Sequence, residues 1–358
     1  MIKKNFVLLT ICLFFIAIIT SACGGGDKTT PSDNSAYYYL LAQQNANNNE
    51  QEQQNEPTPE PSPTPDPSPT PDPSPTLPTL EVLKSELSLI VGSSEDITVT
   101  LEGKTVTEGL KYDVEKPEVS KVENGTVTAL AKGSTTVTVS LEGANSAVFT
   151  VKVVGKGDYV EFGNYRQTGD AENADEWEPQ PIEWQILDID TANNRALLLS
   201  RYGLDAKAFD YDLNVWGDSD ICIWLNGDFY YNAFDKLERD KIKPVDIVFN
   251  ADGSDYYNFD NDTYRVFLLS KAEVTNTEYF ANDKSKKCEP TAYAKNNEAW
   301  WVEEDGYCYW WLRSPYSDQD DQTQRGTGVR NDAQFYFEHV RDNSCVVRPA
   351  LWIKLNNN

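Results

Sequence analysis

Residues 79–154 alternate between apolar and polar side chains in short runs that are rich in valine and threonine. The runs read LSLIVG, EDITVTL, GTVTALAKG, STTVTVSL and SAVFTVKVV, with Gly, Asn or Pro between them. A period of two places alternate side chains on one face of a strand, and strands at this spacing are typical of a β-sandwich. The pattern therefore predicts an all-β immunoglobulin-like sandwich over residues 79–154.

Residues 155–358 mix this strand pattern with helical spacing. Ile221, Trp224, Leu225 and Phe229 form an apolar helical face after a cap at Asp218 or Ser219, and residues 235–242 predict a second short helix. Strands are expected in DYVEFGNY, PIEWQILDID, NRALLLSRY, YRVFLLS, YWWLRSP and VVRPALWIKL. We predict an α+β domain over residues 155–358.

The N-terminus has the layout of an export signal. Lys3 and Lys4 precede a short apolar run over residues 6–19, and small residues lead to Cys23 in TSAC. This end resembles the lipobox of bacterial lipoproteins, although Thr20 replaces the usual leucine. The resemblance implies removal of residues 1–22, a lipid on Cys23, and a protein anchored in the bacterial cell envelope and exposed at the surface. A plain secretory signal with a chance cysteine is the alternative.

Residues 23–78 are expected to be a disordered tether. The first part is rich in Asn and Gln, and residues 57–78 read PTPEPSPTPDPSPTPDPSPTLP. Proline at this density prevents helix and sheet and favours an extended polyproline II spacer.

The chain carries a net charge of −26 with a pI near 4.3, so nucleic acid is excluded as a partner because phosphate binding needs a basic surface. His339 is the only histidine, which removes most histidine-based metal sites and weakens acid–base hydrolysis. Cys222, Cys288, Cys308 and Cys345 remain beyond the signal and Cys23, and in an exported chain they predict up to two disulfides of undetermined pairing.

The stretch ENGTVTALAKGSTTVTVSLEG carries a more specific signal, because Gly125, Val127, Ala129, Gly133, Val137 and Val139 follow a G-x-V-x-A-x-x-x-G-x-x-x-V-x-V pattern. It resembles the group 2 bacterial immunoglobulin-like domain. That resemblance implies a stalk in a surface protein, with direct binding as the alternative.

The blocks FGNY, PIEWQIL, ALLLSRY, WLNGDFYYNAF, VFLLS, WWLRSP and VRPALWI resemble an uncharacterised domain family of secreted and lipid-anchored bacterial proteins. More remotely, the terminal strands resemble the C-type lectin-like fold, which includes the formylglycine-generating enzymes. This second resemblance implies irregular loops that bind ligands near the last strands.

Residues 317–344 are polar and irregular, with the residue types of adaptable binding surfaces. We expect a ligand face formed by Trp301, Arg330, Asn331, Gln334, Tyr336, His339 and Arg341. The alternative is a solvated hairpin. In CYWWLRSP, Trp311 could stack on a ligand, but a core strand with Arg313 in a buried network is favoured because aromatic residues usually mark the core.

Oxygen ligands gather in residues 250–264, where Asp252, Asp255, Asp260 and Asp262 could hold Ca²⁺. An acidic chain produces such clusters by chance, so a solvated loop is favoured and no cofactor is required. Cys345 with His339 as base is a weak catalytic candidate. The sequence favours a non-catalytic domain that binds an extracellular protein or glycan; an envelope enzyme acting on glycan or peptide and a structural component stay as alternatives.

Overall fold

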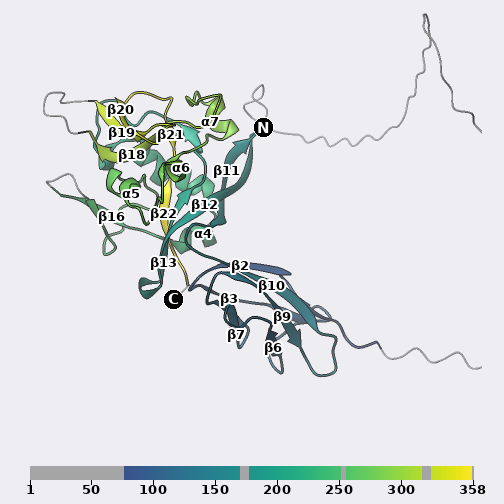
Figure 1. Ribbon diagram of the computed structural model, residues 1–358. Coiled ribbons are helices and arrows are strands. Elements are labelled where there is room, and N and C mark those ends of the chain that lie inside the picture. Colours follow the sequence, from purple (N-terminus) through teal and green to yellow (C-terminus); the bar gives the residue numbers. More distant parts are fainter. Residues whose placement is uncertain (1–75, 170–176, 251–254, 317–323, 357–358) are drawn as a thin grey trace, which may run out of the picture. The chain divides into compact units, whose positions relative to one another are not determined.

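The computed structural model in Figure 1 describes residues 76–169, 177–250, 255–316 and 324–356, which all lie within one compact unit, residues 73–358. The predicted signal, Cys23, nearly all of the tether and Asp252 fall outside the described residues. Within the described ranges, no helix is long and apolar enough to cross a membrane.

The first described part, up to Val154, is built of strands alone. They are β1 (Leu80–Val82), β2 (Glu86–Ile90), β3 (Ser94–Asp96), β4 (Val99–Leu101), β5 (Lys104–Val106), β6 (Lys111–Val114), β7 (Ser120–Glu123), β8 (Thr126–Ala129), β9 (Gly133–Ser140) and β10 (Ala147–Val154). They form sheets of order β1-β4-β5, β2-β10-β9-β6 and β3-β8-β7. This arrangement is consistent with the predicted immunoglobulin-like sandwich.

The quoted valine pattern forms the core of this part. Val127, Val137 and Val139 are fully buried, and they pack with Phe149 in one cluster. Gly125 follows Asn124 in the turn between β7 and β8, where the two residues have φ of +83° and +52°. Positive φ at both positions belongs to a tight hairpin turn and favours Asn-Gly. The first glycine of the pattern therefore sets the turn, and the alternate residues after it fill the core.

The second part is mostly β-sheet with a few short helices. Its strands are β11 (Tyr159–Thr168), β12 (Glu178–Asp190), β13 (Arg195–Ser200), β14 (Asp205–Ala206), β15 (Ile242–Lys243), β16 (Asp246–Phe249), β17 (Asp255–Asn258), β18 (Trp310–Pro315), β19 (Arg325–Val329), β20 (Phe335–His339), β21 (Val346–Val347) and β22 (Ala350–Lys354). The sheets have the orders β11-β12-β13-β22-β15, β14-β21-β18-β19-β20 and β16-β17. Figure 1 shows β18, β19 and β20 side by side.

The helices are η2 (Thr191–Asn193), η3 (Trp216–Asp218), α2 (Asp220–Trp224), η4 (Leu225–Phe229), α3 (Tyr230–Ala233), α4 (Lys236–Lys241), α5 (Lys271–Thr275), α6 (Asp283–Lys286) and α7 (Ala292–Asn296). The predicted helix after residue 218 runs through α2, the π-helical η4 and α3. Ser219 caps it, because its hydroxyl accepts a hydrogen bond from the Cys222 N–H at 3.3 Å.

The prediction of a strand over residues 264–270 is wrong. Only Tyr264 and Phe267 form isolated bridges there, to Val245 and Ala350. The Asn226 side chain accepts from the Arg265 and Val266 N–H groups and donates to the Val266 carbonyl at 2.9 Å. Between the two bridges, a side chain thus satisfies backbone groups that a neighbouring strand would otherwise pair with.

Candidate binding face

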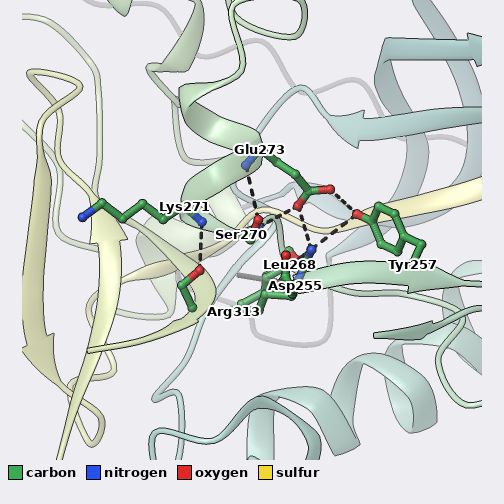
Figure 2. Close-up of polar contacts among 8 residues, drawn as sticks. Asp255, Tyr257, Leu268, Ser270, Lys271, Glu273 and Arg313 are labelled. Atoms are coloured by element: carbon green, nitrogen blue, oxygen red, sulfur yellow. Dashed lines mark hydrogen bonds and ion pairs between the residues drawn. The ribbon is translucent and has the colours of Figure 1, made fainter. Parts of the chain in front are cut away.

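Arg313 on β18 is the centre of a buried polar network (Figure 2). Its guanidinium forms ion pairs with Asp255 at 2.7 Å and with Glu273 at 2.8 Å, and it donates to the Leu268 carbonyl at 2.7 Å. The Arg313 side chain is 1% exposed. Burial alone would lower the pKa of this guanidinium, but the charges of Glu273, Tyr257 and Asp255 raise it above its usual value.

Glu273 also forms a capping box with Ser270 at the N-terminus of α5. Its carboxylate accepts from the Ser270 N–H at 2.7 Å, and the Ser270 hydroxyl accepts from the Glu273 N–H at 3.2 Å. Next to it, the Ser314 hydroxyl accepts from the Lys271 N–H at 2.9 Å. The Arg-Ser pair of WWLRSP thus fixes α5 and β17 against β18, which confirms the core interpretation of this motif.

The chain contains two pairs of adjacent tryptophans, Trp300-Trp301 and Trp310-Trp311, and the two pairs differ in solvent exposure. Trp310 and Trp311 on β18 are both fully buried, so Trp311 does not reach a ligand surface. Trp301 is half-buried, and Lys295 lies 3.8 Å from its ring centre. Its neighbour Trp300 is 42% exposed. The sequence placed Trp301 on the ligand face, because nothing in the order Ala-Trp-Trp-Val tells which ring faces outward.

Trp300, Tyr309 and Tyr336 form a row of tilted ring contacts, with interplanar angles of 44° and 53°, which we call the aromatic platform. The ring centres of Trp300 and Tyr309 are 4.2 Å apart, and those of Tyr309 and Tyr336 are 4.7 Å apart. The Arg330 guanidinium lies 5.9 Å from the Tyr309 ring centre. The Trp300 backbone N–H donates to the Ser344 carbonyl. Nearby, the Asn343 amide donates to the Glu298 carboxylate at 2.8 Å. The platform therefore has exposed polar groups at its edge.

Gly328 on β19 makes room for the last ring of the platform. It pairs directly with Tyr336, and a Cβ at residue 328 would meet the Tyr336 ring and would lie 2.9 Å from the Trp310 carbonyl. The far end of Tyr336 is held at Cys345, with 2.5 Å between the phenol oxygen and the sulfur. Burial, followed by the influence of Cys345, raises the pKa of Tyr336 well above its usual value, so the phenol stays protonated.

The structure divides the predicted ligand face into two groups. Arg330, Asn331 and Gln334 form the turn between β19 and β20, where the Arg330 N–H donates to the Gln334 carbonyl at 2.9 Å. Arg330 and Gln334 are exposed and Asn331 is half-buried. With Tyr336, this turn lies at the platform end of the hairpin.

His339 and Arg341 belong to the opposite end, because His339 pairs with Arg325 at the start of β19. The His339 ring contacts Gln324 at 2.9 Å. Arg341 pairs with Asp212 and lies 3.9 Å from the Tyr211 ring centre. The structure thus brings Tyr336 and the turn together with Trp300, but not with His339 and Arg341.

The cysteine–histidine pair considered for catalysis is separated. Cys345 is 1% exposed and contacts Tyr336, whereas His339 is exposed and its Nδ1 accepts from the Arg341 N–H at 3.2 Å. Burial raises the pKa of the Cys345 thiol, which disfavours a thiolate. Cys222, Cys288, Cys308 and Cys345 are all buried thiols in this structure, so the predicted disulfides stay a prediction.

Of the predicted calcium ligands, Asp255 is bound by Arg313, and Asp260 and Asp262 are exposed. Asp252 lies outside the described residues. Within the described part of the chain, no group of three or more His, Cys, Asp or Glu side chains is arranged to hold a metal ion.

Comparisons with known proteins match two parts of the chain. The model of a domain of unknown function, DUF6273, matches residues 193–355, and the model of the hyaluronate lyase N-terminal beta-sheet domain matches residues 100–153. No curated protein matches the sequence. A solved C-terminal fragment of intimin, in complex with the intimin-binding domain of its translocated receptor, is 14% identical over 34% of this chain, with a TM-score of 0.18. This chain spans 58% of that intimin chain. The C-terminal part thus resembles an uncharacterised domain family, and residues 100–153 resemble a β-sheet domain.

Proposed function

We propose that the protein is a lipid-anchored envelope protein that presents a non-catalytic binding or adhesion domain at the cell surface. In this account, a lipid on Cys23 holds the chain to the membrane, the proline-rich tether extends from it, and a group 2 immunoglobulin-like domain acts as a spacer. The C-terminal domain, with a C-type lectin-like fold, contacts an extracellular protein or glycan.

The aromatic platform is the observation that carries this proposal. Trp300 is 42% exposed although its ring contacts Tyr309, and the Tyr309 ring in turn contacts Tyr336. Large aromatic rings contribute most of the binding free energy when a ligand covers them, and they lose little side-chain entropy because they have few rotatable bonds. An exposed ring that rests on a second ring in this way is therefore a pre-organised contact for a sugar ring or an apolar side chain.

The polar neighbours of the platform supply the hydrogen bonds that a specific ligand needs. Arg330 is 45% exposed and pairs with Asp332 at 3.5 Å, an ion pair that a ligand could replace at little cost because both partners are already hydrated. Glu298 and Asn343 provide an exposed carboxylate and amide beside Trp300. The separation of His339 from Cys345 favours binding over cysteine-based catalysis.

A glycan-array and extracellular-matrix screen with the full chain tests the proposal. Binding is expected for the wild type and for Tyr231→Ala, a matched control because Tyr231 is 66% exposed and lies on α3. The signal should fall strongly for Trp300→Ala. Repeating the screen with EDTA tests the calcium prediction at Asp260 and Asp262. A signal that Trp300→Ala leaves unchanged would contradict the assignment of the platform.

A further inference from the structure

Cys288 and Cys308 lie side by side in the core of the C-terminal part. The Cys308 N–H donates to the Cys288 carbonyl at 2.8 Å, and the Cys308 thiol donates to the same oxygen at 3.1 Å. The two side chains also contact each other, and they are 1% and 0% exposed. Residues joined across neighbouring segments in this way have Cα atoms about 5 Å apart, a separation that a disulfide spans.

The other two described cysteines make their side-chain hydrogen bonds elsewhere, although Cys345 is also near enough to Cys308 to influence it. Cys345 contacts the Tyr336 phenol at 2.5 Å, and Cys222 on α2 accepts from the Asn226 amide at 3.8 Å. Of the pairings that the sequence left open, the backbone contact between Cys288 and Cys308 selects one.

We propose that the exported chain carries a disulfide between Cys288 and Cys308 and keeps Cys222 and Cys345 as thiols. The oxidant is the disulfide of a thiol–disulfide exchange partner. One thiolate attacks that disulfide and releases one partner thiol, and the second cysteine then displaces the other. Two protein thiols and one partner disulfide are consumed, and one protein disulfide and two partner thiols are formed. Because both thiols are buried in the folded chain, the bond forms while the chain folds.

This disulfide would fix the segment that carries the aromatic platform. The two cysteines are 20 residues apart, and the loop between them contains Trp300, Trp301 and Lys295. Closing the loop restricts the unfolded chain and limits the positions that Trp300 can occupy. The disulfide proposal rests on the export of the chain in the proposed function, because export brings the cysteines into an oxidising compartment.

Peptide mapping of the full chain, refolded in a glutathione redox buffer, tests the pairing without requiring export or a ligand. Free thiols are alkylated in denaturant before trypsin digestion. Trypsin cuts after Lys287, Lys295 and Arg313, so Cys288 and Cys308 fall in the separate peptides 288–295 and 296–313. The expected result is these two peptides joined, and Cys222 and Cys345 alkylated. All cysteines alkylated, or any cross-link that uses Cys222, Cys345 or the peptide containing Cys23, would overturn the proposal.

Thermal unfolding with and without a reducing agent gives a second readout. Reduction should lower the Tm of the oxidised wild type by roughly 6–12 °C. The shift should persist in the matched control Cys222→Ser/Cys345→Ser and vanish in Cys288→Ser/Cys308→Ser. The same shift in both double variants would contradict the pairing. A normal map combined with failed ligand binding would instead reject the proposed function and leave the disulfide in place.

Discussion

Arg313 on β18 and Glu273 on α5 form a buried ion pair with 2.8 Å between the guanidinium and the carboxylate, and the same carboxylate caps the helix that carries it. A change at Arg313 therefore acts on the sheet, on α5 and on Asp255 together. Figure 2 shows these contacts meeting at one guanidinium.

The first prediction concerns this network. Arg313→Met should lower the free energy of unfolding by about 3–5 kcal/mol, because it leaves the Asp255 and Glu273 carboxylates buried without their cation. Arg341→Met is the matched control, since Arg341 pairs with Asp212 at the surface and its loss should change little. Urea unfolding of both variants measures the difference. Equal stabilities for the two variants would show that the buried network is not what holds β18 and α5 together.

A second prediction concerns the space beneath the platform. Gly328→Ala should destabilise the chain by about 1–3 kcal/mol, because the new methyl group meets the Tyr336 ring and the Trp310 backbone, neither of which is free to move away. Gly227→Ala is the control: its Cβ would meet nothing within 4 Å, and alanine should stabilise this helical position by up to about 1 kcal/mol. The Tm measured by thermal unfolding distinguishes the two variants. An unchanged Tm for Gly328→Ala would contradict the position of the Tyr336 ring against Gly328.

Alkaline pH provides a third prediction. Burial raises the pKa of the Cys222 thiol from 9.0 to about 12. The unfolded chain therefore loses this proton first, so the stability that the protonated thiol contributes is complete below pH 9 and is lost as pH rises toward 12. The loss is at most about 1.4 kcal/mol per pH unit. In reducing buffer, Cys222→Ser should show a smaller fall in stability between about pH 8 and pH 10 than the wild type. Identical falls would mean that Cys222 ionises normally in the folded protein.

The regular parts of the fold could be predicted from the sequence, because they follow periodic burial. Val127 and Val137 lie where the alternation places them, and Ser219 caps the helix at one of the two positions considered. The segment 264–270 has a strand pattern but forms only isolated bridges, and Asn226, which lies 39 and 40 residues before Arg265 and Val266, bonds the backbone between those bridges. A contact of that kind leaves no periodic trace in the sequence.

The candidate site was predictable only in part, for the same reason. The sequence placed Trp301 and residues of the 317–344 region on a ligand face, but it did not indicate that the Trp300 ring would contact Tyr309 and that Tyr309 would contact Tyr336. It grouped Arg341 with the ligand face, whereas the structure pairs Arg341 with Asp212 on a distant loop. It gave Asp255 as a solvated residue that could hold calcium, and only the fold reveals Arg313 as its partner.

The most direct measurement is the affinity of the full chain for the strongest ligand of the binding screen, compared among the wild type, Trp300→Ala and Tyr231→Ala. The account predicts that Trp300→Ala weakens binding by about 10-fold or more, as expected for a central aromatic contact, and that Tyr231→Ala leaves it unchanged. Unfolding curves confirm that each variant is folded. Unaltered affinity in Trp300→Ala, or no ligand for the folded wild type, would contradict the proposal that the aromatic platform is a binding site.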